Sequence, residues 1–434
     1  MIIMENKNQT KLIKKILIIA CAVIVCASMF LGGFIAGKSS LSKEIDSLKY
    51  VLDIYHKHYY EESDDVLGLI SDALFDQYST YYTAEEYALI KQSAQGKHEG
   101  FGVSFLNGSN VIYQVKGNSP AFKAGIKKDG AITGIRQSGQ GDFVLIETYE
   151  NLAEEISKIS SYVDVDLRID YNGTESVYTL QKQAYTETFV FYYDNTGEYA
   201  FNDLTGEMAF ARYGDNTEYP LDKADVAVIK YTGFSGTQSG ILGSAGQFAS
   251  ALKKFKEDGK KHLIIDIRNN GGGYMNILCQ IASHLIEGEN GQKKLVTVAV
   301  DKYGTREEFL SDKITYNDYG FESIVFLANE DSASASEALM GAVLDYDTKG
   351  IVSVVLEGNN GVYKSYGKGI MQSTFERPFT GEAVKVTTAK IYWPVSNVCI
   401  HGVGLTSDMT GYNVYAETSK NSAFYDALNI IFKN

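Results

Sequence analysis

The pattern of hydrophobic and polar positions divides the chain into stretches with different expected structures. An uncharged apolar run covers residues 16–37, and hydrophobic residues at spacings of three and four over 42–95 predict amphipathic helices. Between about 96 and 184 apolar and polar residues alternate, which predicts short strands interrupted by one helix over 152–159. From 226 onwards, strand-length apolar runs alternate with helical patterns, which predicts a layered α/β domain.

In this last stretch the pattern is clear enough to assign individual elements. We expect strands at 226–230, 262–267, 295–300 and 324–328, and helices near 240–256, 275–286 and 335–345. Residues 185–225, rich in Tyr, Asp, Asn and Thr, have weak periodicity. They predict hairpins or loops that connect the two domains.

The apolar run at 16–37 has the length and flanks of a membrane anchor. As a helix its 22 residues would span roughly 30 Å, the thickness of a bilayer core. Four lysines precede it, at positions 7, 11, 14 and 15, which predicts a cytoplasmic N-terminus and an extracytoplasmic remainder in a bacterial envelope. We expect an uncleaved single-pass anchor. The alternative is a signal sequence whose removal would leave a secreted protein.

Composition excludes several classes of function. The chain of 434 residues carries 54 acidic and 40 basic side chains, a net charge of −14, which argues against nucleic acid as a partner. Its four cysteines cannot form a disulfide framework for this length. The six histidines stand in no metal-binding or triad spacing, and no phosphate-binding loop is present, so we expect neither metal nor cofactor.

One segment that could carry chemistry is a strand-to-helix turn containing Ser334. Ser334 and Glu337 have the spacing of a capping box, which explains the pair without any catalytic role. A serine at such a turn can also present its hydroxyl as a nucleophile, because the helix N-terminus offers free N–H groups to a developing oxyanion. The local pattern allows both interpretations.

Two glycine-rich turns add to this picture. Residues 271–273 are three glycines after a buried strand, which fits either a plain turn or a backbone that supplies oxyanion donors. Lys368 stands between two glycines and is either an exposed turn residue or a buried general base. As a base it needs a pKa lowered from about 10.4, which desolvation can provide.

Together these segments resemble the carboxyl-terminal processing, or tail-specific, proteases, which are serine–lysine peptidases that carry a PDZ domain. The matching segments are, in chain order, 76–83 (DQYSTYYT), 99–103 (EGFGV), 118–126 (NSPAFKAGI), 266–273 (DIRNNGGG), 332–337 (SASASE), 366–372 (YGKGIMQ), 392–394 (YWP) and 402–405 (GVGL) with Asp408. The resemblance implies a helical lead-in at 42–95, a PDZ domain at 96–184, a connecting insertion at 185–225, and a ClpP/crotonase-like layered α/β peptidase core at 226–434.

The resemblance also assigns roles to residues of the core. It implies that Ser334 is the nucleophile, with Ser336 as the alternative if the register is wrong, and that Lys368 is the general base. Gln372 would orient the lysine, and Asp345 matches a family aspartate with a supporting role. The resemblance therefore implies a Ser–Lys dyad without histidine.

Backbone groups complete the expected sites. The N–H groups of Gly272 and Ala335 would form the oxyanion hole. The PDZ domain would bind a terminal carboxylate with its loop, formed by Gly100, Phe101, Gly102 and Val103. The partners implied are proteins or peptides with exposed C-termini, the membrane through the N-terminal helix, and a second copy of the chain in a homodimer.

The sequence departs from the family pattern in two places. Gly271 stands where the family has proline, and Ser334 and Lys368 are 34 residues apart, more than is usual in the family. The extra residues fall near 357–365, where Asn359-Asn360-Gly361 predicts a tight hairpin that returns the chain to its starting point. If the insertion lies elsewhere, Lys364 is the alternative base. If the spacing prevents catalysis, the chain is an inactive membrane-tethered PDZ scaffold.

Overall fold

The computed structural model describes residues 45, 48–55, 57, 65–105, 109–202, 209–236, 243–418 and 423–432. The chain divides into two compact units, residues 1–70 and 71–434. In the first, residues 48–55 are helical. Among the described residues no helix is both long and apolar enough to cross a bilayer. The anchor expected at 16–37 lies outside the described residues.

The lead-in consists of short elements. It contains α2 (Val66–Leu74), β1 (Thr80–Tyr82) and α3 (Ala84–Ser93). Thr83 caps α3: its hydroxyl accepts from the Glu86 N–H, and the Glu86 carboxylate accepts from the Thr83 N–H at 2.8 Å. These two reciprocal bonds form a capping box.

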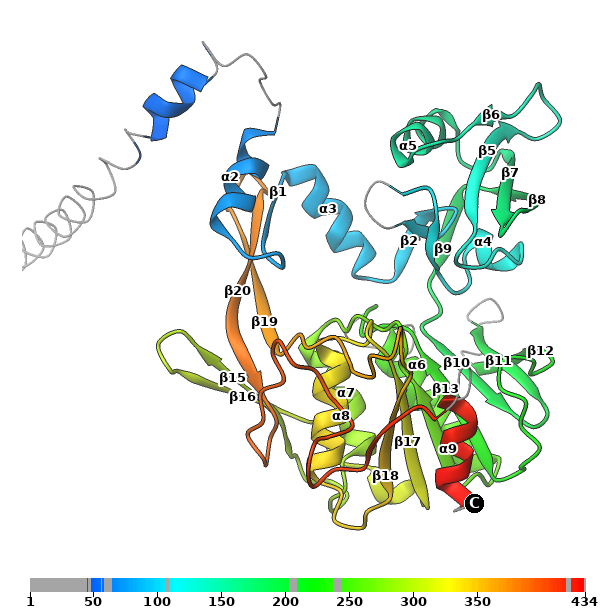
Figure 1. The fold of residues 1–434 in the computed structure, drawn as a ribbon, viewed down its shortest axis with the longest axis vertical. Helices are drawn as coiled ribbons and strands as arrows, with labels where there is room; N and C mark the ends of the chain where they lie inside the picture. Colours follow the sequence, from blue (N-terminus) through cyan, green and yellow to red (C-terminus); the bar gives the residue numbers. More distant parts are fainter. Residues whose placement is uncertain are drawn as a thin grey trace, which may run out of the picture. The chain divides into compact units, whose positions relative to one another are not determined.

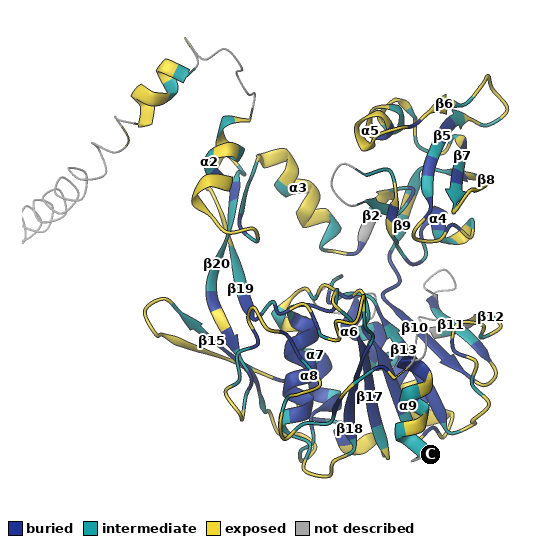
Figure 2. Cartoon of the chain, in the orientation of Figure 1, coloured by how far each residue is buried: buried dark blue, intermediate teal, exposed yellow. Residues whose placement is uncertain are grey.

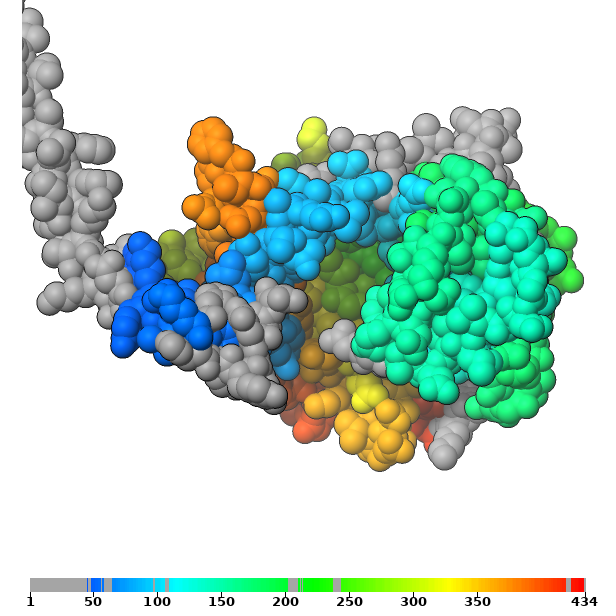
Figure 3. All heavy atoms as spheres, turned by 90° about the horizontal axis from the view of Figure 1, so that it is seen from above, coloured from blue at the N-terminus to red at the C-terminus, as the bar shows by residue number. Residues whose placement is uncertain are grey.

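A small β-rich module follows the lead-in and has its own hydrophobic core. Its elements are β2 (Lys97–Gly100), β3 (Val103–Phe105), β4 (Ile112–Val115), α4 (Pro120–Lys123), β5 (Ala131–Gln137), β6 (Val144–Leu145), α5 (Tyr149–Lys158), β7 (Asp164–Tyr171), β8 (Thr174–Gln181) and β9 (Gln183–Thr186). Buried side chains between 101 and 180 form one cluster, and the module gathers into one lobe (Figure 3). Strands β2 and β9 pair antiparallel, which brings the two ends of the module together.

The peptidase-like core is built on a mostly parallel sheet (Figure 1). In the described residues its order is β12-β11-β10-β13-β14-β17-β18-β21. These strands are β10 (Val190–Asp194), β11 (Gly197–Asn202), β12 (Ala209–Gly214), β13 (Val226–Tyr231), β14 (His262–Asp266), β17 (Ser323–Ala328), β18 (Val352–Leu356) and β21 (Val414–Ala416). Neighbouring strands from β13 to β21 run parallel.

Residues 185–225 do form hairpins, as expected, but these hairpins belong to the core sheet and are more than a connection between two domains. Strand β10 pairs antiparallel with β13, so this stretch extends the core sheet by three strands. Every residue from Val190 to Asp194 is buried. A strand covered on both faces shows no alternation of polar and apolar residues, which is why its periodicity is weak.

Helices cover both faces of this sheet (Figure 2). One buried cluster joins the sheet to α6 (Ser244–Glu257), α7 (Met275–Leu285) and α8 (Ala335–Asp345). A second cluster joins the opposite face to α9 (Ala423–Phe432). The strands and helices assigned from sequence between 226 and 345 are confirmed to within a few residues at their ends.

A second sheet contains β19, the strand that begins two residues after Lys368. It comprises β1, β15 (Leu295–Asp301), β16 (Arg306–Leu310), β19 (Ile370–Glu376) and β20 (Ala383–Tyr392), and the 3-10 turn η1 (Tyr316–Asp318) lies between β16 and β17. Strand β20 is central: it pairs with β19, with β15 and, through Lys385 and Thr80, with β1. The lead-in is thereby joined to the strand that follows Lys368.

Candidate active site

Ser334 lies where the chain passes from β17 into α8. It is the N-cap of α8, with φ 56° and ψ −113°. A non-glycine residue with positive φ is strained, and such strain concentrates at functional sites. Ser334 is partly exposed, whereas the serines on either side of it are not. Of the three serines in this turn, Ser334 alone presents its side chain to an open space.

The two neighbouring serines hold the turn together. Ser332 is fully buried and its hydroxyl donates to the Ile267 carbonyl at 2.8 Å. Ser336 is fully buried and donates to the Asn270 carbonyl at 2.8 Å. Both hydroxyls therefore attach the turn to the loop after β14. The alternative nucleophile, Ser336, has no access to a substrate.

A buried carboxylate connects the Ser334 turn to the loop between β18 and β19, residues 357–369, which contains Lys368 and is called the lysine loop below. The Glu337 side chain is 0% exposed and accepts from the backbone N–H of Ser334 at 2.9 Å. It also accepts from the N–H of Gly367 at 2.7 Å, the N–H of Lys368 at 2.9 Å and the hydroxyl of Ser365. Burial raises the pKa of Glu337, while these donors act in the opposite direction. One side chain thus fixes both loops.

Lys368 shares a cavity with Ser334. The cavity is about 10 Å³, room for roughly one water molecule. Its other walls are mainly apolar: Met275, Ala335, Ala338, Gly369, Ile370, Ile391, Trp393 and Ile400. Lys368 is partly buried, and desolvation followed by the charge of Lys385 lowers its pKa. A lowered pKa is what a lysine general base requires.

The insertion leaves Lys368 in this position. Asn359 and Val362 exchange backbone hydrogen bonds, and Asn360 and Gly361 have positive φ, as in a tight two-residue hairpin turn. The hairpin predicted there is confirmed. The backbone of Lys364 forms an antiparallel β-bridge with Thr406, and Lys364 does not line the Ser334 cavity.

The amine of Lys368 does not contact Ser334 through a hydrogen bond. Among the described residues it has no hydrogen-bond partner, and its Nζ lies 4.9 Å from the centroid of the Tyr78 ring. Gln372 is on β19, and its buried Nε2 also has no partner among the described residues. Ser334 and Lys368 therefore line one cavity without a hydrogen bond between them.

The glycine turn packs directly against the Ser334 turn. A Cβ on Gly272 would lie 2.7 Å from the Ala335 nitrogen and 2.9 Å from the Ser334 Cβ. Only glycine allows this approach, and the φ of Gly272 is +95°. The Gly272 N–H, however, donates to the Asn270 side chain at 3.0 Å. The two expected oxyanion donors are neighbours, and that of Gly272 is engaged within its own loop.

Asp345 does not lie near Ser334 and Lys368. It ends α8, eleven residues long, so it lies roughly 15 Å along the helix from Ser334. Its carboxylate accepts from the N–H groups of Val395 and Ser396 at 2.9 Å and from the Tyr412 hydroxyl at 2.6 Å. Asp345 therefore holds the loop after β20, and a catalytic role is not what its contacts support.

The β-rich module has a groove where the peptide site is expected. The groove is about 670 Å³ and lies between α5, the C-terminal part of α3 and the loop of Gly100, Phe101, Gly102 and Val103. Its walls include the apolar side chains of Phe105, Leu152 and Ile156, and the basic side chains of Lys116 and Lys182. A groove with apolar and basic side chains beside a glycine loop suits a peptide whose terminal carboxylate meets the loop.

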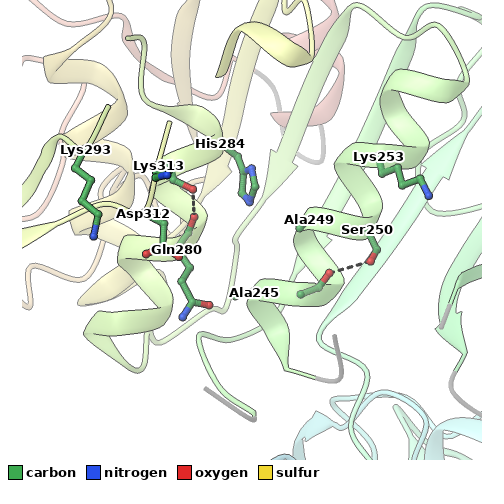
Figure 4. Close-up of a pocket in the computed structure, with 11 residues that line it drawn as sticks. Ala245, Ala249, Ser250, Lys253, Gln280, His284, Lys293, Asp312 and Lys313 are labelled. Carbon is green, nitrogen blue, oxygen red and sulfur yellow. Dashed lines mark hydrogen bonds between the residues drawn. The ribbon is translucent and has the colours of Figure 1, made fainter. Parts of the chain in front are cut away.

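A further pocket of about 820 Å³ contains none of these residues (Figure 4). It lies between α6 and α7 and is lined by His284, Lys253, Lys293, Lys313 and others. His284 bonds to Thr315 and Tyr319, and burial lowers its pKa to about 4, so it is neutral near pH 7. These contacts agree with a structural role for this histidine.

Comparison with known proteins shows which family the core resembles. Residues 225–410 match the model of Peptidase family S41. A "Probable CtpA-like serine protease" of Staphylococcus epidermidis is 26% identical over 412 residues, which cover 92% of this chain and 70% of that protein. One of Staphylococcus aureus is 25% identical over 426 residues, 96% and 73% of the two chains.

The fold is also found among solved structures. A protein from Bacteroides fragilis superposes with a TM-score of 0.50 at 12% identity, over 86% of this chain and 91% of that one. Identity this low shows a shared fold alone. The sequence matches show more: residues 225–410 form a peptidase family S41 domain, and nearly the whole chain is similar to CtpA-like serine proteases.

Proposed function

We propose that this chain is a membrane-anchored extracytoplasmic endopeptidase that cleaves proteins near exposed C-terminal tails with a Ser334–Lys368 dyad. The observation that supports it is one cavity lined by both side chains. Glu337 accepts hydrogen bonds from the backbone N–H groups of both residues, which holds the two loops against each other. An exposed turn lysine would need neither arrangement.

The chemistry follows from these groups. The neutral amine of Lys368 accepts the Ser334 hydroxyl proton as Oγ bonds to the peptide carbonyl carbon. The Ala335 N–H and the glycine turn stabilise the oxyanion, and the ammonium protonates the leaving amine as the C–N bond breaks. Water, deprotonated by Lys368, then hydrolyses the acyl-enzyme and the proton returns to Ser334. The Gly272 N–H must first leave Asn270.

The groove of the β-rich module supports the choice of substrate. A C-terminal peptide can pair with β3 as an added strand, with its carboxylate at the Gly100–Val103 loop and its side chains against α5. The anchor at 16–37 and a homodimer belong to the same proposal and rest on the sequence. The anchor would keep the core outside the cytoplasm, close to envelope proteins.

A soluble fragment starting near residue 42 tests the dyad. We expect it to cleave unstructured protein substrates, and we expect Ser334→Ala and Lys368→Ala each to lower kcat by about 10³-fold or more. Product masses would show whether the cuts lie near C-termini. Lys364→Ala is the matched control and should remain active, because Lys364 does not line the Ser334 cavity.

Retained cleavage in Ser334→Ala would sink the assignment. If Lys364→Ala loses cleavage activity and Lys368→Ala keeps it, Lys364 is the general base. If the wild-type fragment binds C-terminal peptides but cleaves nothing, the inactive scaffold is the correct function.

A further inference from the structure

The amine of Lys368 has a specific neighbour from a distant part of the chain. Its Nζ lies 4.9 Å from the centroid of the Tyr78 ring. A cation within about 6 Å of an aromatic face is attracted by the ring quadrupole. Tyr78 belongs to the segment between α2 and β1, outside the part of the chain that carries Ser334 and Lys368. It therefore adds a lead-in residue to the surroundings of the base.

The backbone around Tyr78 is hydrogen-bonded to β20 of the second sheet. The Asp76 carboxylate accepts from the Tyr78 N–H at 3.1 Å and from the Ser79 hydroxyl at 2.6 Å. The Ser79 oxygen in turn accepts from the Thr387 N–H of β20 at 3.0 Å. Strand β1 then pairs with β20. Residues before and after Tyr78 are therefore fixed by hydrogen bonds, and these bonds position the ring beside the amine.

The Tyr78 ring has a second neighbour on the lysine loop, the aromatic ring of Tyr366. The rings of Tyr78 and Tyr366 meet edge to face with centroids 6.4 Å apart, and their hydroxyls are 3.5 Å apart. Tyr366 is two residues before Lys368. The lead-in therefore contacts the lysine loop as well as the amine itself.

The charges around the amine are mixed. Lys385 on β20 disfavours the ammonium, as does burial, whereas Asp76 and Glu337 favour it. The face of an aromatic ring also favours the charged form. Tyr78 and Asp76, both from the lead-in, thus oppose the deprotonation that a general base needs.

Given the dyad proposed above, we propose that Tyr78 is a positioning residue for the base. Its ring holds the Lys368 ammonium in a resting place beside the lead-in, and the amine must leave this ring to bond Ser334. The lead-in segment is then part of the active site, and it sets the pH at which the enzyme becomes active.

The test compares Tyr78→Leu and Tyr78→Met with Tyr78→Phe in the full-length chain. Removing the ring takes away a contact that stabilises the ammonium, so the acid limb of kcat/KM against pH should move down by about one pH unit. Below the limb, kcat/KM should then rise about tenfold. Tyr78→Phe keeps the ring and should follow the wild type.

Tyr81→Leu is the matched control. Tyr81 belongs to the same segment but bonds Glu382, so its removal disturbs the lead-in without touching the amine. Its profile should keep the wild-type limb. If the Leu and Met variants lose activity equally at all pH values, or if their limb coincides with that of Tyr78→Phe, the ring has only a structural role and the proposal is overturned.

An activity-independent measurement separates this proposal from the dyad. Carbon-13 labelled lysine, observed by NMR in a Ser334→Ala background, gives the Lys368 titration directly, with Lys368→Ala to assign its signal. A lower pKa in Tyr78→Leu than in Tyr78→Phe supports the contact even if Lys368→Ala stays active and the dyad fails. An equal pKa in both variants refutes the contact even if the dyad holds.

Discussion

At the scale of single residues, Glu337 shows how much one side chain can organise. The Ser-x-x-Glu spacing predicts its bond to the Ser334 backbone, and the structure adds three donors from the lysine loop, at Ser365, Gly367 and Lys368. A fully buried carboxylate with four donors is costly to disturb, because each donor left unpaired in the interior loses free energy. The carboxylate acts by positioning the two loops.

Glu337→Gln tests this position. In the glutamine side chain, an NH₂ group replaces one of the two carboxylate oxygens. Because each of these oxygens accepts from a backbone N–H, the NH₂ group would face another donor in either orientation of the amide. We expect the free energy of unfolding to fall by about 1–3 kcal/mol and kcat/KM to fall at least tenfold. Urea unfolding and kinetics measure both.

Glu330→Gln is the control for that change. Glu330 precedes the Ser334 turn, is exposed and bonds only the Asn359 side chain among the described residues. Its substitution should change stability by less than about 0.5 kcal/mol. If Glu337→Gln behaves like Glu330→Gln, the carboxylate does not hold the loops.

At the scale of elements, the two turns at the end of the parallel strands form the site. The turn after β14 brings Gly272 against the first residues of α8, and the turn after β17 brings Ser334 to the same place. Carboxyl ends of neighbouring parallel strands meet at one sheet edge, which is why two turns distant in sequence become one site.

The glycine turn offers a matched pair of substitutions. A Cβ at Gly272 would lie 2.7 Å from the Ala333 carbonyl oxygen, whereas a Cβ at Gly271 would have no atom within 4 Å. Gly272→Ala should lower the free energy of unfolding by about 1–3 kcal/mol and reduce kcat sharply. Gly271→Ala should leave both nearly unchanged. Comparable losses in the two variants would contradict the close packing of Gly272 on Ser334.

At the scale of the whole molecule, the β-rich module is separable in its packing. Its buried cluster is distinct from the clusters of the peptidase core, and its first and last strands pair with each other. Such closure permits a segment to fold without the rest of the chain. The module's Phe122 also packs against Phe191 of β10, with ring centroids 5.5 Å apart.

Residues 96–186 expressed alone should therefore unfold cooperatively and bind peptides. We expect titration calorimetry to show binding of apolar peptides with a free C-terminal carboxylate and little binding of the same peptides with an amidated end. Equal affinity for both forms would mean that the Gly100–Val103 loop does not recognise the carboxylate.

The sequence alone determined much of this protein. Buried strands and amphipathic helices repeat with periods set by backbone geometry, so α8 was predicted at its observed bounds, and the spacing of Asn360 and Gly361 predicted the hairpin in the insertion. Local backbone preferences suffice for such elements. The family motifs likewise selected the segments that meet at the site.

Only the tertiary structure decided which side chains meet across long distances in the chain. Strand β10 joins the core by pairing with β13, the Tyr78 ring reaches Lys368 because β1 pairs with β20, and the Asp345 carboxylate bonds Tyr412. No local pattern records such contacts, since each depends on where two separately folded segments are placed by the packing of all the others.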